Sequence, residues 1–419
     1  MQNRGQMNMA NTLSDDTLII LIAPNVTEQM GGEGIKALQI FQEIKKIHAN
    51  TIQITHERNR IELSDRLKLA DVYYVADTKL ALFLWHSRIL SKLLDPWFCY
   101  KAVKMAETIA KERGLKRNSV IIHQTEPNSP VIPRTISKRH ANVFGPINGN
   151  IYYPPIFRRN EMLSARLRRI FHMPIQRLNR ILFRGLTKAN FILCAGGART
   201  RDSLLAAGCS PDILVDSPDC GIKDDILAIP RVQHSGTNFR FVHFGSLRFH
   251  KCTSFIIESL AKTKNPVCLD IIGKGPELER CQKLTEELNL GHRVRFLDRF
   301  TDHRDLILFI RQYRGALLPS IEDANGIVVQ ESMALGLPMI CLDWGGPQLS
   351  IENQVSGFLI EPNAKNYIII KMAEYLDHLS IDGDLAERIS LAARERAEIW
   401  RWSRVARDWI NLYARISRK

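Results

Sequence analysis

The sequence predicts an α/β protein made of two domains, each with an open parallel β-sheet that is covered by helices on both faces. Short apolar runs recur along the whole chain, and most of them are followed by a polar loop and an apolar pattern of helical spacing. Continuous apolar runs of this length are typical of strands that are buried on both faces. At 419 residues the chain is long enough for two domains, each with its own core.

In the first half, strands are predicted at residues 17–23, 72–75, 119–122 and 191–194. The first of them leads into a polar loop that contains Gly31 and Gly32, after which apolar residues recur at helical spacing as far as Ile47. Strand, loop and helix in this order form the repeating unit of an open parallel sheet, so we expect one such sheet here.

The second half repeats the pattern, with strands predicted at residues 240–244, 267–272, 293–297, 315–318 and 339–342. Patterning is weakest between Asp219 and Asn238, and the boundary is placed there, giving a first domain of residues 1–222 and a second of residues 223–398. Residues 399–419 are rich in arginine and tryptophan. We expect them to form a helix that packs back on the first domain.

The composition is ordinary for a globular protein, with 45% hydrophobic and 24% charged residues. No apolar run approaches the roughly 20 residues that span a bilayer, and the first sixteen residues resemble no secretion signal. The eight cysteines form no C-x-x-C pair, and the histidines have no metal-ligand spacing. These features favour a cytoplasmic protein without disulfides or a zinc site.

The net charge of +14 predicts attraction to anions. Nucleotide phosphates, nucleic acid and an acidic membrane surface are all compatible with this charge, which by itself does not choose among them.

Glycine-containing loops follow several of the predicted strands. They open at Gly31, Gly245, Gly273 and Gly345, and a further polar loop follows the strand that ends at Leu318. Ligands bind beyond the carboxyl ends of the strands in open α/β sheets, which is where all these loops lie. Taken singly, each loop is more often a simple turn than a binding site.

The most informative of these loops contains two acids, Asp323 and Glu331, on either side of Gly326. Gly326 opens a predicted helix, and the unpaired N–H groups of a helix N-terminus form a natural phosphate site. A carboxylate further along the helix can accept hydrogen bonds from sugar hydroxyls. The segment 320–338 resembles the acid-x7-acid motif of family 4 glycosyltransferases, with Asp323 where glutamate is commoner. Other family motifs follow in the same order across residues 238–363.

The resemblance implies a GT-B fold with two facing Rossmann-like domains. It further implies a retaining glycosyltransferase that moves a sugar from a nucleotide-sugar donor to a glycan or lipid-linked acceptor, in surface polysaccharide or glycolipid synthesis. Members of the family need no divalent metal ion and no other cofactor. The lack of an Asp-x-Asp motif at a strand end agrees with this, since Asp382-Gly383-Asp384 lies in a late loop.

The resemblance also assigns roles in the second domain. Lys251 matches the lysine that contacts the donor diphosphate, and Glu331 matches the glutamate that hydrogen-bonds the ribose. Asp323 matches the acid near the transferred sugar, with Glu322 as its neighbour. Negative charge develops on the diphosphate as it departs, so a cation at Lys251 suits this chemistry.

Backbone groups are expected to complete the donor site. Gly326 and Ile327 would donate N–H groups to the phosphates, and the loops at Gly245 and Gly273 would line the donor. Most relatives have an arginine directly after the first of these loop glycines, but this chain has Ser246 there. Arg248 is the candidate replacement, with an ordinary surface charge as the equal alternative.

Three residues of the first domain join this hypothesis. Gly31 and Gly32 would let the backbone approach the donor phosphate. His123, at the end of a predicted strand, matches a histidine that often lines the reaction centre of the family. A lone histidine at a strand end is also often structural, and both interpretations stay open here.

The segment 157–188 is rich in arginine and has a single acid, Glu161. Apolar residues recur at helical spacing on both sides of Pro174, which predicts one or two basic amphipathic helices. The plain interpretation is a helix that faces the core and exposes its arginines to water. The alternative is docking on anionic lipid at the inner face of the cell membrane.

Two other functions remain open from the sequence. A nucleotide-sugar epimerase or hydrolase would share the fold and the donor site. A non-catalytic protein that binds polyanions would account for the charge, but it has no need of the paired acids Asp323 and Glu331. Nucleic acid is therefore not an expected partner.

Overall fold

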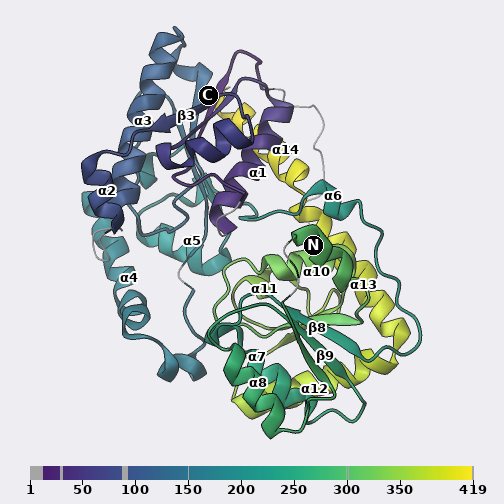
Figure 1. Cartoon of the computed structure of the whole chain (residues 1–419). Helices are drawn as coiled ribbons and strands as arrows, with labels where there is room; N and C mark the ends of the chain where they lie inside the picture. The colour runs from purple at the N-terminus through teal and green to yellow at the C-terminus, as the bar shows by residue number, and fades with distance from the viewer. Residues whose placement is uncertain are drawn as a thin grey trace. The chain divides into compact units, whose positions relative to one another are not determined.

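A computed structural model describes residues 13–28, 32–86, 93–149, 151–298, 300 and 302–417. The chain divides into two compact units (Figure 1). Unit 1 consists of Met1–Gly149, His172–Asp219 and Trp402–Lys419, and unit 2 consists of Asn150–Phe171 and Cys220–Arg401.

Unit 1 contains a seven-stranded sheet in the order β3-β2-β1-β4-β5-β6-β7, in which all neighbours are parallel. The order reverses between β1 and β4, which is where open sheets of this kind offer a crevice. The strands are β1 (Leu18–Ile22), β2 (Thr51–His56), β3 (Val72–Val75), β4 (Val120–Gln124), β5 (Ala141–Ile147), β6 (Phe191–Cys194) and β7 (Leu214–Asp216).

Helices cover both faces of this sheet because alternate residues of each strand point to opposite sides. Ile19 and Leu21 of β1 pack in the core that α1 and α14 cover, whereas Leu18, Ile20 and Ile22 pack in the core that α3 covers. The helices are α1 (Gly32–Ile47), α2 (Lys79–His86), α3 (Leu94–Glu112), α5 (Gly197–Ala206) and α14 (Trp402–Ser417), together with the second half of α4 (Leu163–Leu182).

The C-terminal helix α14 is part of the unit 1 core. Trp402, Trp409 and Tyr413 are buried there together with residues of β1, β4 and β5. This is the return to the first domain that the aromatic content of residues 399–419 predicted.

Unit 2 contains a six-stranded parallel sheet in the order β10-β9-β8-β11-β12-β13, with one apolar core on each face. Its strands are β8 (Arg240–Phe244), β9 (Cys268–Ile272), β10 (Val294–Leu297), β11 (Gly315–Leu318), β12 (Met339–Leu342) and β13 (Phe358–Ile360). Its helices are α6 (Asp224–Leu227), α7 (Thr253–Leu260), α8 (Leu278–Glu287), α9 (His303–Ile310), α10 (Ile327–Leu335), α11 (Gly345–Ser350), α12 (Lys365–Ile381) and α13 (Gly383–Ala397).

The segment Asn150–Phe171 differs from the sequence prediction, which placed all of residues 1–222 in one domain. Its backbone is tied to unit 2 by the indole N–H of Trp344, which donates to the carbonyl of Tyr152 at 2.8 Å. Tyr153 and Phe157 are buried in a core of the same unit. The partner residue lies 192 positions away in the chain, so no local pattern reveals this assignment.

Candidate functional site

An ion pair between Lys251 and Asp323 lies at the carboxyl edge of the unit 2 sheet. Lys251 ends a short turn after β8, and Asp323 lies in the loop after β11. The Nζ atom of Lys251 is 2.5 Å from Oδ2 of Asp323, and both side chains are mostly buried, at 18% and 14% exposed. The other oxygen, Oδ1, accepts the backbone N–H of Gly326 at 2.8 Å. One carboxylate thus joins the ammonium to the N-terminus of α10.

The two groups that Asp323 holds are those that attract phosphate, a lysine ammonium and the N-terminus of a helix. The sequence predicted both Lys251 and Gly326 as donor contacts, and the structure brings them to one carboxylate. An anionic ligand that binds here competes with Asp323 for both partners. Binding of such a ligand would therefore release the Asp323 carboxylate from these two groups and leave it available to another partner.

The loop that carries Asp323 is fixed to its neighbours through the backbone. The N–H of Ile321 donates to the carbonyl of His250 at 2.9 Å, and the N–H of Gly346 donates to the carbonyl of Asp323 at 2.7 Å. The loops after β8, β11 and β12 are therefore joined at this edge. Burial raises the pKa of Glu322, the preceding acid, which also interacts with Arg168.

Gly245 and Gly273, two of the predicted donor-site glycines, lie where the loops after β8 and β9 touch. A Cβ on Gly273 would lie 1.8 Å from the carbonyl oxygen of Gly245, so no larger residue fits there. Gly326 has a φ of +61°, a left-handed conformation that glycine adopts at low cost, and it caps α10. The predicted contacts of these glycines with a donor stay a prediction.

Glu331 lies in α10 with its side chain 9% exposed, and it pairs with a residue that the sequence analysis missed. The Nε2 atom of His303, at the start of α9, is 3.0 Å from Oε1 of Glu331. This hydrogen bond raises the pKa of His303 even though burial opposes the rise. The one signal in the sequence was the position of His303, beyond the carboxyl end of a predicted strand.

The remaining predicted residues of unit 2 are more exposed. The side chain of Arg248 is exposed and has no hydrogen bond or ion pair among the described residues. Ile327, the first residue of α10, is 39% exposed. Their proposed contacts with the donor phosphates stay a prediction.

In unit 1, His123 is fully buried and both of its ring nitrogens have partners. Nδ1 is 2.5 Å from the hydroxyl of Tyr413, and Nε2 is 2.6 Å from the carbonyl oxygen of Gly145. Burial lowers the pKa of His123 to about 3, so the ring is neutral near pH 7. In this arrangement His123 joins α14 to β4 and β5, and its predicted place in the reaction centre stays a prediction. Gly32 begins α1, and Gly31 lies outside the described residues.

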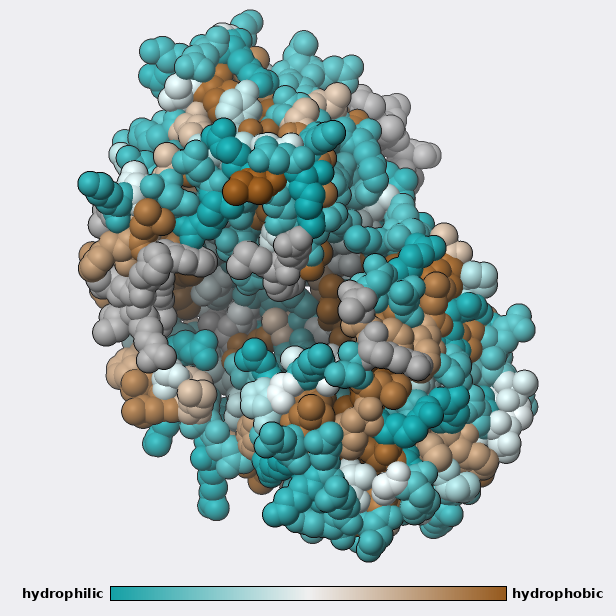
Figure 2. Space-filling view, in the orientation of Figure 1, coloured by the Kyte–Doolittle hydropathy of each residue, from teal (hydrophilic) through white to brown (hydrophobic). Residues whose placement is uncertain are grey.

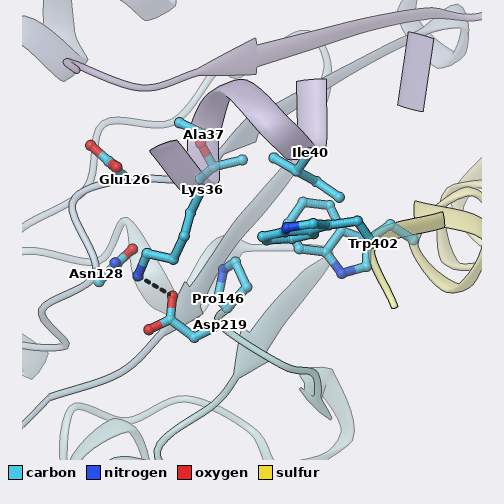
Figure 3. Close-up of a pocket in the computed structure, with 10 residues that line it drawn as sticks. Lys36, Ala37, Ile40, Glu126, Asn128, Pro146, Asp219 and Trp402 are labelled. Atoms are coloured by element: carbon cyan, nitrogen blue, oxygen red, sulfur yellow. Dashed lines mark hydrogen bonds and ion pairs between the residues drawn. The ribbon is translucent and has the colours of Figure 1, made fainter. Parts of the chain in front are cut away.

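A small cavity lies at the carboxyl edge of the unit 1 sheet, beside α1 and α14 (Figure 3). Lys36 and Asp219 form an ion pair of 3.0 Å in its wall, with Trp402 and Ile40 on another side. Glu126, which also lines the cavity, is 3% exposed, and burial raises its pKa well above the usual range. The cavity volume is about 20 Å³, which is room for a single water molecule and not for a sugar.

Residues 227–396, which include β8 to β13, Lys251, Asp323 and Glu331, match the family model described as glycosyl transferases group 1. Over those residues the chain is similar to this family. An uncharacterized glycosyltransferase of Methanocaldococcus jannaschii, MJ1607, is 26% identical over 172 residues, which are 40% of this chain and 43% of that protein. The match thus spans less than half the length of this relative.

Solved structures have the same fold over nearly the whole chain. The lipopolysaccharide outer core galactosyltransferase WaaB superposes with a TM-score of 0.64 at 17% identity, covering 96% of this chain and all of that one. Anabaena Alr3699/HepE in complex with UDP superposes with a TM-score of 0.60 at 16% identity, covering 94% and 98%. The predicted α/β fold with two Rossmann-like domains of the GT-B type is thereby confirmed.

Proposed function

We propose that the protein is a retaining glycosyltransferase of family 4 that moves a sugar from a nucleotide-sugar donor to a glycan or lipid-linked acceptor. The observation that carries the proposal is the Asp323 carboxylate, which joins Lys251 to the N-terminus of α10 inside the group 1 domain. The product would be a surface polysaccharide or a glycolipid.

The side chains around this carboxylate have distinct roles in the proposed reaction. Lys251 and the N-terminal N–H groups of α10 stabilise the negative charge that develops on the departing diphosphate. Glu331 accepts hydrogen bonds from the ribose of the donor. Asp323, released from Lys251 by the phosphates, lies beside the transferred sugar. The positive charge in this scheme comes from the protein, and no metal ion or cofactor is invoked.

The named relatives support the two substrate classes. HepE was solved in complex with UDP and with UDP-glucose, which supports a nucleoside diphosphate sugar as donor. WaaB is named for transfer of galactose to lipopolysaccharide, which supports a glycolipid or surface glycan as acceptor.

A donor panel tests the proposal directly. We expect one of UDP-glucose, UDP-galactose, UDP-GlcNAc, GDP-mannose and ADP-glucose to raise the thermal unfolding temperature, and mass analysis to show sugar transfer once a glycolipid acceptor is added. Conversion of that donor without any acceptor would instead identify an epimerase or hydrolase. Salt-sensitive binding of nucleic acid, with no stabilisation by any nucleotide sugar, would identify a polyanion-binding protein.

We also propose that α4 docks on an anionic membrane, because the helix packs with its polar side. Gln176 and Asn179 are buried in unit 1 and donate to backbone carbonyls, those of Pro130 and Val131, at 2.9 Å. The large apolar residues of α4 are exposed instead (Figure 2), and they include Leu163, Leu167, Ile170, Phe171, Leu178, Ile181 and Leu182.

Exposed arginines border this apolar face, namely Arg166, Arg168, Arg177 and Arg180. A helix with an apolar face and flanking cations is suited to lie in the interface of an anionic bilayer. Among the described residues, no helix is both long and apolar enough to cross a membrane. Contact by the face of α4 would place the protein at the inner surface of the cell membrane.

Charge reversal tests the membrane proposal. The variant R166E/R168E/R177E is expected to lose most of its binding to vesicles that contain phosphatidylserine or phosphatidylglycerol, because each basic residue near the surface contributes about 1 kcal/mol. Arg169 is left unchanged because it pairs with the buried Glu161. The variant K262E/K283E/R388E changes the net charge equally at exposed sites elsewhere in unit 2 and serves as the control. Equal sedimentation of both variants with the vesicles would contradict the proposal.

A further inference from the structure

The pair formed by His303 and Glu331 has features that a purely structural contact does not require. The Glu331 carboxylate is 9% exposed, and among the described residues the side chain of His303 is the one that pairs with it. His303 is itself 56% exposed, so its ring is open to solvent. A buried carboxylate with a single partner keeps an oxygen for another donor.

His303 is not needed to begin its own helix. Asp302 caps α9, since its Oδ1 accepts the N–H of Arg304 at 2.7 Å and that of Asp305 at 3.2 Å. The imidazole of His303 therefore does not cap α9, and its Nε2 contacts Glu331 instead. Lys223 and Asp302 are the other charged groups that act on His303.

We infer that His303 is a positioning residue for the nucleotide. Its Nε2 holds Oε1 of Glu331, which fixes the rotamer of a flexible side chain and leaves Oε2 for a ribose hydroxyl. A carboxylate that is already oriented loses less conformational freedom when the nucleotide binds. This inference rests on the proposed function, because it deepens the role of Glu331 in that donor site.

The inference predicts coupling between His303 and the ribose hydroxyls. Calorimetry would compare ADP, GDP and UDP with their 2′,3′-dideoxy forms, and inorganic pyrophosphate would serve as a ligand without ribose. The wild-type protein is expected to bind at least one ribonucleotide about tenfold more tightly than its dideoxy form, because a hydrogen bond to a charged group has about this effect. In His303→Ala the ratio should fall to about twofold or less, with pyrophosphate binding unchanged.

The conservative variant His303→Gln keeps an N–H donor and should restore most of the ratio. Equal weakening of the ribo and dideoxy forms in His303→Ala, or weaker pyrophosphate binding, would show a general loosening of α9 and overturn the inference. A wild-type ratio near one would overturn it as well while leaving donor binding intact. If the proposed function itself is wrong, the result is different, because neither a nucleotide nor pyrophosphate then binds to the wild-type protein.

Discussion

Under the proposed function, Lys251→Ala is expected to lower the turnover number for sugar transfer by about 100- to 1000-fold. The ammonium is the one mostly buried cation at the Asp323 carboxylate in the described site, and loss of a preorganised electrostatic contact to a leaving group has an effect of this size. The fold should persist because Asp323 still accepts the N–H of Gly326. Because the pair is mostly buried, removing the ammonium is nevertheless expected to lower the free energy of unfolding by about 3 kcal/mol.

The measurement is initial-rate kinetics with the best donor from the panel, together with denaturant unfolding of each variant. Lys262→Ala, which removes an exposed lysine of the same unit, is the control and should retain full turnover. Lys251→Arg keeps the charge and should retain part of it. Turnover of Lys251→Ala within threefold of the wild-type value would remove Lys251 from the donor site.

Trp409→Ala destabilises unit 1 by about 3–5 kcal/mol, the usual loss when a large aromatic side chain is removed from a core. Trp409 is 2% exposed, its ring centroid lies 4.7 Å from that of His123, and its indole N–H donates to the hydroxyl of Ser217 at 3.0 Å. Truncation therefore leaves a cavity and removes a hydrogen bond between α14 and the end of β7.

Hydrogen exchange is the suitable measurement because it reports on each unit separately. Protection of amides in β1 and β4 should fall in Trp409→Ala, while that of β8 and β11 should change little. Arg407→Ala, at an exposed position on the same helix, is the control. Unchanged protection in β1 would show that α14 is dispensable for the unit 1 core.

The strands that the sequence predicted are short, mostly apolar runs, and most of them are buried, whereas β3 and β10 are only partly buried. The predicted run 240–244 matches β8, and the runs 315–318 and 339–342 match β11 and β12. A short, continuous apolar run in an α/β chain is typical of a strand that is buried on both faces. β2 was missed because it mixes polar and apolar residues, yet every one of its side chains is buried. β5 was missed as well, because it contains Gly145 and Pro146, which usually end a strand.

The candidate site was predictable as far as sheet topology places it. Lys251 and Asp323 follow neighbouring strands, and the carboxyl ends of parallel strands meet at one edge. The partners of individual side chains were not predictable in this way. The bond between His123 and Tyr413 joins residues 290 positions apart, and that between His303 and Glu331 depends on how α9 packs beside α10.

The position of α14 in the unit 1 core has a consequence for how the chain is made. Residues 220–401 leave the ribosome before α14 does, so unit 2 can finish folding while the apolar side of β1 that α14 covers still faces solvent. Unit 1 therefore matures only after translation has passed Trp409 and Tyr413. A premature stop codon just before Trp402 would therefore leave unit 2 complete but remove α14 from the unit 1 core, which would expose unit 1 to chaperones and proteases.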